Sequence, residues 1–170
     1  EKIGIVSQES FLFDASIFDN ITYGVEEPKK VDVEQAIEKS QCKEFIDKLP
    51  DGLNTVVGER GQILSGGQRQ RISIARTLIR NPEVIIFDEA TSAVDNKTEQ
   101  HIQKAIFEII KDRTSIIIAH RLSTIRNCQN IFVLDDGKVI EQGNHDSLIN
   151  QKDSYYKKLW NIQTGNIADS

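Results

Sequence analysis

The stretch from Leu64 to Asp95 places the strongest constraint on how this 170-residue chain can fold. It opens with LSGGQ and continues into a segment whose apolar side chains recur at helical spacing, at Ile72, Ala75, Leu78 and Ile79. Asn81-Pro82 predicts the end of that helix, because proline disfavours helical geometry in the residue before it. The apolar run Val84–Phe87 then predicts a short strand of a parallel sheet, covered on both faces.

The start of the predicted helix is suited to binding a phosphate group. Ser65 is the predicted N-cap, so three backbone amides follow at a helix N-terminus, those of Gly66, Gly67 and Gln68. A helix N-terminus is electropositive, and glycine lets a phosphate approach the backbone closely. A Gly-Gly pair taken alone, however, is more typical of a flexible loop.

The end of the predicted strand carries two acids, Asp88 and Glu89. Open parallel sheets bind their ligands at the carboxyl ends of the strands. Two acids after an apolar run are, by themselves, more typical of a solvated turn. The direct connection of a phosphate-binding helix start to a buried strand with two terminal carboxylates favours a functional site.

This stretch resembles the signature motif, Walker B strand and D-loop of ATP-binding-cassette (ABC) ATPases. The letters that carry the resemblance are LSGGQ followed by RQRISIARTLI, and then VIIFDEATSAVD. The resemblance implies an α/β fold of the P-loop NTPase (RecA-like) type, with a parallel-sheet core and an inserted helical signature subdomain. It implies one partial nucleotide-binding domain over residues 1–170, with its core at 1–8 and 64–170 and the helical subdomain at 9–63.

The resemblance also assigns roles to four side chains, with ATP as substrate and Mg²⁺ as cofactor. Asp88 would hold Mg²⁺ through water, and Glu89 would orient and deprotonate the attacking water. Gln8 follows a short apolar strand and matches the Q-loop, which reaches the Mg²⁺ and that water. His120 follows the predicted strand Ser115–Ala119 and matches the switch histidine, which hydrogen-bonds the γ-phosphate. Without the resemblance, Gln8 is typical of a polar loop and His120 of a structural histidine.

Two partners are implied by the same resemblance. The signature residues would contact the γ-phosphate of a nucleotide held by a second nucleotide-binding domain; they are Ser65, Gly66, Gly67 and Gln68. Asp95 would lie across the same dimer interface, in a motif where the family more often has leucine in place of Val94. A transmembrane domain would lie near Phe11–Phe13 and residues 16–23, although the sequence alone predicts that the aromatic side chains there are core.

One family motif is absent from the sequence. There is no G-x-x-x-x-G-K-[ST], so the Walker A loop and its phosphate-binding lysine are missing, as is the aromatic residue that stacks on adenine. Both precede the Q-loop in the family, so we expect a fold that is incomplete at the N-terminus and inactive toward ATP when alone. The missing segment should supply a central strand, and its loss should expose apolar edges of Val84–Phe87 and Ser115–Ala119.

Composition narrows the remaining choices. Hydrophobic residues make up 38% and charged residues 28%, and no apolar run approaches the roughly 18 residues of a membrane span. The net charge of -5 argues against nucleic acid as the main partner. Asp135-Asp136-Gly137-Lys138 predicts a hairpin near the C-terminus. The composition is that of a soluble domain. The resemblance implies that this domain lies at the cytoplasmic face of a membrane and couples ATP hydrolysis to export.

Two other functions remain open at this point. One is a non-transport ABC ATPase, either SMC-like or associated with translation. The SMC-like proteins have long coiled coils between Q-loop and signature, and none is predicted between Gln8 and Leu64. The other is a non-catalytic module that completes the ATP site of a partner.

Overall fold

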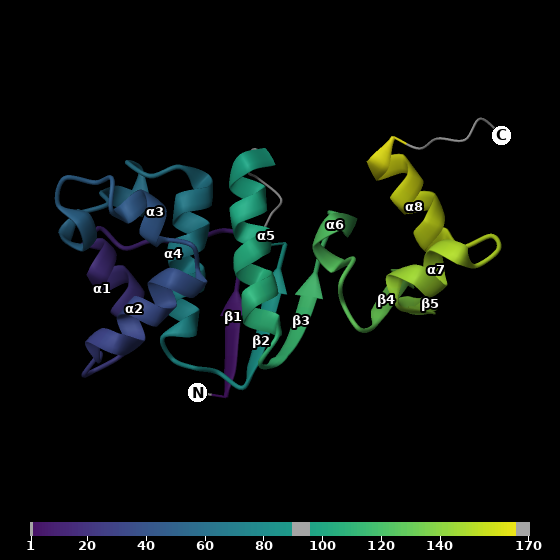
Figure 1. Ribbon diagram of the computed structural model, residues 1–170, viewed down its shortest axis with the longest axis horizontal. Helices are drawn as coiled ribbons and strands as arrows, with labels where there is room; N and C mark the ends of the chain where they lie inside the picture. Colours follow the sequence, from purple (N-terminus) through teal and green to yellow (C-terminus); the bar gives the residue numbers. More distant parts are fainter. Residues whose placement is uncertain (1, 90–95, 166–170) are drawn as a thin grey trace. The chain divides into compact units, whose positions relative to one another are not determined.

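The computed structural model describes residues 2–89 and 96–165, without the side chains of residues 96–98. The chain forms two compact units, Glu1–Ile118 and Ala119–Ser170, which are described separately (Figure 1). The first unit contains β1 (Ile3–Val6), α1 (Ile17–Thr22), α2 (Lys30–Lys39), α3 (Lys43–Ile46), the 3₁₀ turns η1 (Gly52–Asn54) and η2 (Glu59–Gly61), α4 (Gly66–Leu78), β2 (Val84–Asp88), α5 (Asn96–Ile110) and β3 (Thr114–Ile118). None of the described helices is long and apolar enough to cross a membrane.

The sheet of the first unit has the order β1-β2-β3, and both pairs are parallel. In its register Ile5 lies beside Ile86, and Ile86 lies beside Ile116. The expected apolar edge on Val84–Phe87 is therefore wrong, because β2 is the middle strand and is paired on both sides. The edges belong to β1 and β3.

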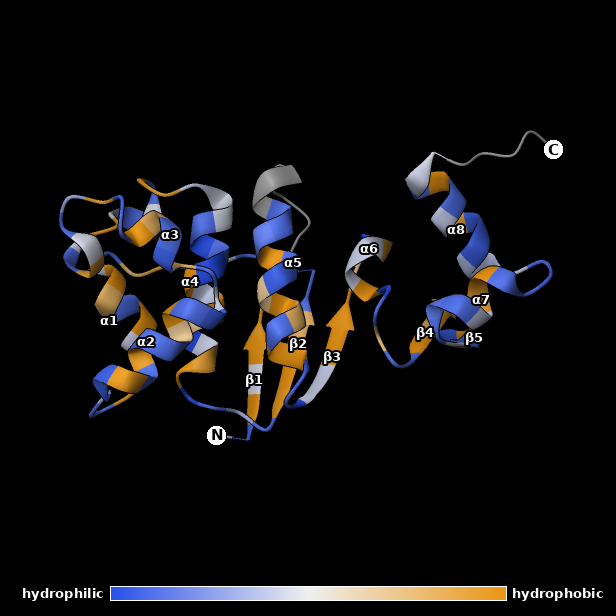
Figure 2. Ribbon diagram, in the orientation of Figure 1, coloured by the Kyte–Doolittle hydropathy of each residue, from blue (hydrophilic) through white to orange (hydrophobic). Residues whose placement is uncertain are grey.

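The two faces of this sheet differ in cover. Ile85 and Phe87 are buried in one core cluster with apolar side chains of α4 and α5. Figure 2 shows that the strands of this sheet are largely hydrophobic. The side chains of the opposite face are more than half exposed on the two outer strands, at Ile3, Ile5, Ile116 and Ile118. The prediction that Val84–Phe87 is covered on both faces is thus wrong within the described residues of the first unit. The apolar run forms the predicted strand, but the helices of this unit that pack on the sheet cover only one of its faces.

Helix α4 is the element around which the first unit packs. Its buried face contacts β1, α1, α2 and α5. Helix α4 approaches β1 closely at Gly4. A Cβ atom added to Gly4 would lie 2.5 Å from the Thr77 Cγ2 atom and 2.9 Å from the Pro82 Cγ atom. The chain leaves the helix through Asn81, whose φ of 45° is left-handed. The predicted helix end at Asn81-Pro82 is confirmed.

The second unit is built on an antiparallel pair, β4 (Ile131–Asp135) and β5 (Lys138–Gly143). The two turn residues, Asp136 and Gly137, have φ values of 44° and 71°, as a type I′ turn requires, which confirms the predicted hairpin. Three helices complete the unit: α6 (Leu122–Ile125), α7 (His145–Asn150) and α8 (Tyr155–Thr164). They enclose a small core with the hairpin, made of Leu122, Ile131, Val133, Leu148 and Tyr156.

We expect substitutions on the two faces of the sheet to have unequal costs. Ile85→Ala removes a side chain that is 1% exposed and should lower the free energy of unfolding by about 2–5 kcal/mol. Ile5→Ala, on the opposite face at 59% exposure, should cost less than about 1 kcal/mol. Hydrogen exchange of the β2 amides reports this unit alone. Equal costs would show that the second face is also covered in solution.

Candidate functional site

Gln8 and Glu89 meet at the carboxyl edge of the parallel sheet. Gln8 follows the end of β1 and Glu89 follows the end of β2, and these two strands are adjacent. The Gln8 Nε2 atom donates a hydrogen bond of 2.8 Å to Glu89 Oε2. The structure thus brings together two of the side chains that the sequence singled out, although 81 residues separate them.

The backbone of Glu89 turns sharply at the strand end. Its φ is 48°, a left-handed value that costs a non-glycine residue about 1–2 kcal/mol. The Glu89 N–H donates to the Ile118 carbonyl at 2.9 Å, which fixes this turn against the end of β3. Left-handed backbone at a non-glycine residue persists only where the surroundings hold it, and it is concentrated at functional sites.

Asp88 is the last residue of β2 and lies half-buried beside Ile118 of β3. Within the described residues, no group of three or more His, Cys, Asp or Glu side chains could hold a metal ion. A closed metal site of that kind is not what Mg²⁺ needs, since Mg²⁺ keeps several waters and uses one or two carboxylates. Asp88, with Glu89 and Gln8 at the same edge, fits a Mg²⁺ ion held largely through water.

The N-terminus of α4 is closed by a reciprocal capping box. The Ser65 Oγ atom accepts from the Gln68 N–H at 3.3 Å, and Gln68 Oε1 accepts from the Ser65 N–H at 2.8 Å. The predicted N-cap at Ser65 is confirmed. Ser65 and Gly66 are exposed and Gly67 is buried, so Ser65 and Gly66 lie at the surface. The Gln68 amide donates to Ser65, whereas the helix itself offers no carbonyl partner to the amides of Gly66 and Gly67, which fits a phosphate ligand.

Arg71, which the sequence analysis did not single out, fixes this helix to its neighbours. It is 5% exposed, and its guanidinium donates to the carbonyls of Gln41 at 2.7 Å and Gly67 at 3.4 Å. The guanidinium carbon also lies 4.9 Å from the centre of the Phe45 ring. Burial lowers the pKa of Arg71. A charged residue on the buried face of an amphipathic pattern was the available signal, because such a group needs partners.

Two further predicted site residues are not among the described residues of the first unit. His120 belongs to the second unit, where it is exposed and its carbonyl accepts a 2.6 Å hydrogen bond from Gln163 Nε2. The same Gln163 accepts from the Leu122 N–H at 2.9 Å, so this side chain holds the segment that carries His120. Asp95 lies outside the described residues.

Comparisons with known proteins identify the family of this chain. A family model described as ABC transporter matches residues 1–92, more than half of the chain. The chain belongs to the ABC transporter family. It is 48% identical over 96% of its length to the mitochondrial ATP-binding cassette sub-family B member 10 of Mus musculus. It is also 48% identical over 95% of its length to the uncharacterized ABC transporter ATP-binding protein YknU of Bacillus subtilis (strain 168).

The structural comparison identifies the fold. The chain matches a bacterial Atm1-family ABC exporter, solved with ATP bound, with a TM-score of 0.87 and 45% identity over 96% of the chain. The predicted P-loop α/β fold with a parallel sheet is confirmed by this match to an exporter of the ABC family. The chain spans 29% of that exporter, 23% of the mouse protein and 28% of the Bacillus protein.

The capping role of Ser65 can be measured in the absence of a ligand. Ser65→Ala removes the Oγ acceptor and should lower the free energy of unfolding by about 0.5–2 kcal/mol. Ser65→Asp keeps a good N-cap and should cost only a few tenths of a kcal/mol. Protection of the Gln68 amide in hydrogen exchange measures the cap directly. Equal loss of protection in both variants would contradict a role for the side-chain acceptor.

Proposed function

We propose that this chain is part of the ATP-hydrolysing domain of an exporter-type ABC transporter, which couples hydrolysis to the movement of a substrate across a membrane. The observation that carries the proposal is the hydrogen bond between Gln8 and Glu89 at the sheet edge, next to Asp88. Phosphoryl transfer to water needs an oriented water and stabilised charge on the transferred group. A carboxylate held by an amide at the end of parallel strands suits the first of these needs.

In this proposal each side chain has one task. Glu89 accepts the proton of the attacking water, and Gln8 holds the Glu89 carboxylate in place through its 2.8 Å hydrogen bond. Asp88 holds Mg²⁺ through water, and the ion neutralises phosphate charge when it is bound. His120, from the second unit, hydrogen-bonds the γ-phosphate. We propose that the chain needs a phosphate-binding Walker A loop for turnover and is inactive alone, since its 170 residues contain no such motif.

Ser65 and its neighbours serve a different nucleotide. We propose that Ser65, with the amides of Gly66 and Gly67, contacts the γ-phosphate held by a second nucleotide-binding domain. Gln68 supports this surface through the capping box, and Asp95 belongs to the same interface. The exposure of Ser65 and Gly66 at the start of a 13-residue helix supports the assignment.

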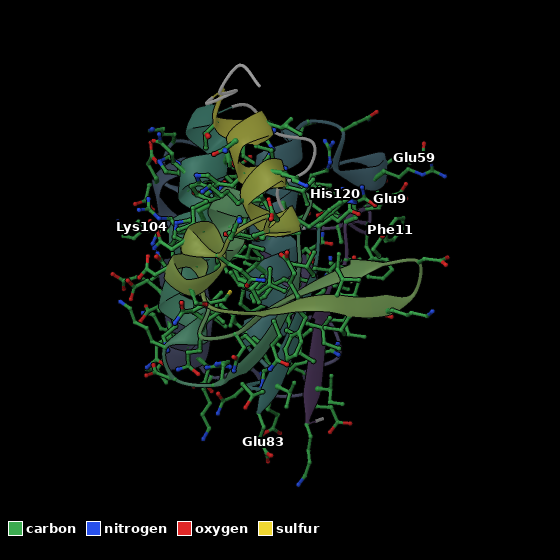
Figure 3. All side chains as sticks on the ribbon, turned by 90° about the vertical axis from the view of Figure 1, so that its right-hand side faces the viewer. Glu9, Phe11, Glu59, Glu83, Lys104 and His120 are labelled. Atoms are coloured by element: carbon green, nitrogen blue, oxygen red, sulfur yellow. The ribbon has the colours of Figure 1, made fainter. Side chains whose placement is uncertain are left out.

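An exposed aromatic surface supports a transmembrane partner. Phe11, Phe13 and Tyr23 are 54%, 37% and 53% exposed, so the prediction that they are core is wrong (Figure 3 labels Phe11). Their rings form a continuous group, with centroids 5.2 Å apart for Phe11–Phe13 and 4.4 Å apart for Phe13–Tyr23. The Arg76 guanidinium lies 5.4 Å from the Phe13 ring. Aromatic and arginine side chains are enriched at interfaces, and we propose that the transmembrane domain docks here, at the cytoplasmic face of the membrane.

The short helices between β1 and α4 argue against an SMC-like protein. The longest of these described helices is α2, with ten residues, and the others are shorter. A coiled coil needs apolar heptads sustained over several turns, which these helices are too short to provide. We propose that residues 9–63 form the helical subdomain of the nucleotide-binding domain.

The role of Glu89 is tested by Glu89→Gln in the complete transporter. The amide keeps the size of the side chain but removes the base, so ATP should still bind while hydrolysis falls by about 10²–10⁴-fold. Single-turnover measurement of phosphate release gives the rate, and equilibrium binding of MgATP is the control. Turnover within about tenfold of the wild type would contradict the assignment of a general base.

The action of Ser65 on a second domain is tested in a covalently linked pair of domains. Ser65→Arg in one domain should abolish hydrolysis at the site whose Walker A loop belongs to the other domain. The arginine side chain would occupy the position of the phosphate. Ser65→Ala in the same domain removes the cap and the hydroxyl contact but leaves the phosphate position open, so it should impair hydrolysis at that site less than Ser65→Arg does. Site-specific hydrolysis is read by inactivating one Walker A loop at a time. Loss at the mutated domain's own site would contradict action in trans.

A further inference from the structure

Gln70 is a buried polar side chain for which the proposed function has no role so far. It lies in the second turn of α4 and is 5% exposed. It shares one face of the helix with the fully buried Ile74, four residues later. An amide in such a position needs hydrogen-bond partners, because an unpaired buried amide costs about 1–3 kcal/mol.

The partners of Gln70 lie on both sides of Gln8. The Gln70 Nε2 atom donates to the Ser7 carbonyl at 3.2 Å, and Gln70 Oε1 accepts from the Ser10 Oγ atom. These contacts join residues 63 and 60 positions apart. The Gln70 side chain therefore holds the Ser7 backbone, just before Gln8, and the Ser10 side chain, two residues after Gln8. Gln8 itself is bonded to Glu89.

We propose that Gln70 is a positioning residue for the Gln8–Glu89 pair of the same chain. This inference rests on the proposed function and adds one residue to it. Gln70 holds the Ser7 backbone before Gln8 and the Ser10 side chain after it, so that Gln8 is placed to align the Glu89 carboxylate.

Thr77 offers a matched control on the same helix. Its Oγ1 atom donates to the Ile5 carbonyl at 3.3 Å or to the Ser73 carbonyl at 3.1 Å. It thus joins α4 to β1, whereas Gln70 joins α4 to the loop that follows β1. Thr77 is also buried, at 9% exposure. A purely structural role for Gln70 predicts similar effects of Gln70→Leu and Thr77→Val.

The test uses the complete transporter and measures kcat and KM for MgATP hydrolysis. Gln70→Leu removes both bonds at similar volume and should lower kcat by about tenfold or more, because small misplacements of catalytic groups can cost up to about 10² in rate. The KM should stay within about twofold, because Gln70 touches no part of the nucleotide. Thr77→Val should keep kcat within about twofold of the wild type. Equal losses of kcat in the two variants would overturn the inference.

A double-mutant cycle shows whether Gln70 acts through Gln8. Gln8→Ala breaks the bond to Glu89, so Gln70→Leu should lower kcat by less than about twofold further in that background. Additive losses of kcat from Gln8→Ala and Gln70→Leu would overturn the inference. If Glu89→Gln is inactive while Gln70→Leu is normal, the positioning role alone fails; an active Glu89→Gln contradicts the proposed function instead.

Discussion

The packing of α4 against β1 is the interaction on which the first unit depends. The helix crosses the strand at Gly4, where the absence of a side chain lets Thr77 and Pro82 approach the backbone. Ser65 lies at the N-terminal end of this helix, and the chain continues from its C-terminal end into β2. Because β2 pairs in parallel with β1, the two strand ends meet, and this brings Gln8 to Glu89.

The site owes its geometry to main-chain constraints more than to pairs of charges. A capping box fixes Ser65, a left-handed backbone turn fixes Glu89, and an amide holds the loop of Gln8. Two buried polar side chains of α4, Gln70 and Arg71, bond to backbone carbonyls of segments distant in sequence. Buried side chains that donate hydrogen bonds to carbonyls favour one packing arrangement of these segments. Any other arrangement would leave the buried donors unpaired, which lowers the stability of the fold.

The sequence predictions failed where burial depends on a partner element. Val84–Phe87 is as apolar as a strand covered on both faces, yet only Ile85 and Phe87 are buried in the described core. Phe11 and Tyr23 are aromatic and were predicted as core, yet both are more than half exposed. Hydrophobicity indicates that a side chain can be covered, but it cannot say whether the cover comes from the same segment of chain.

The sequence by itself determined the local elements and the kind of chemistry. The N-cap at Ser65, the end of α4 at Asn81-Pro82 and the Asp136-Gly137 turn follow from backbone preferences of neighbouring residues, which act at short range. Only the tertiary structure decided which distant groups meet. The contact of Gln8 with Glu89 and of Gln70 with Ser7 and Ser10 depends on strand order, register and helix packing, since these fix the positions of segments about 60–80 residues apart.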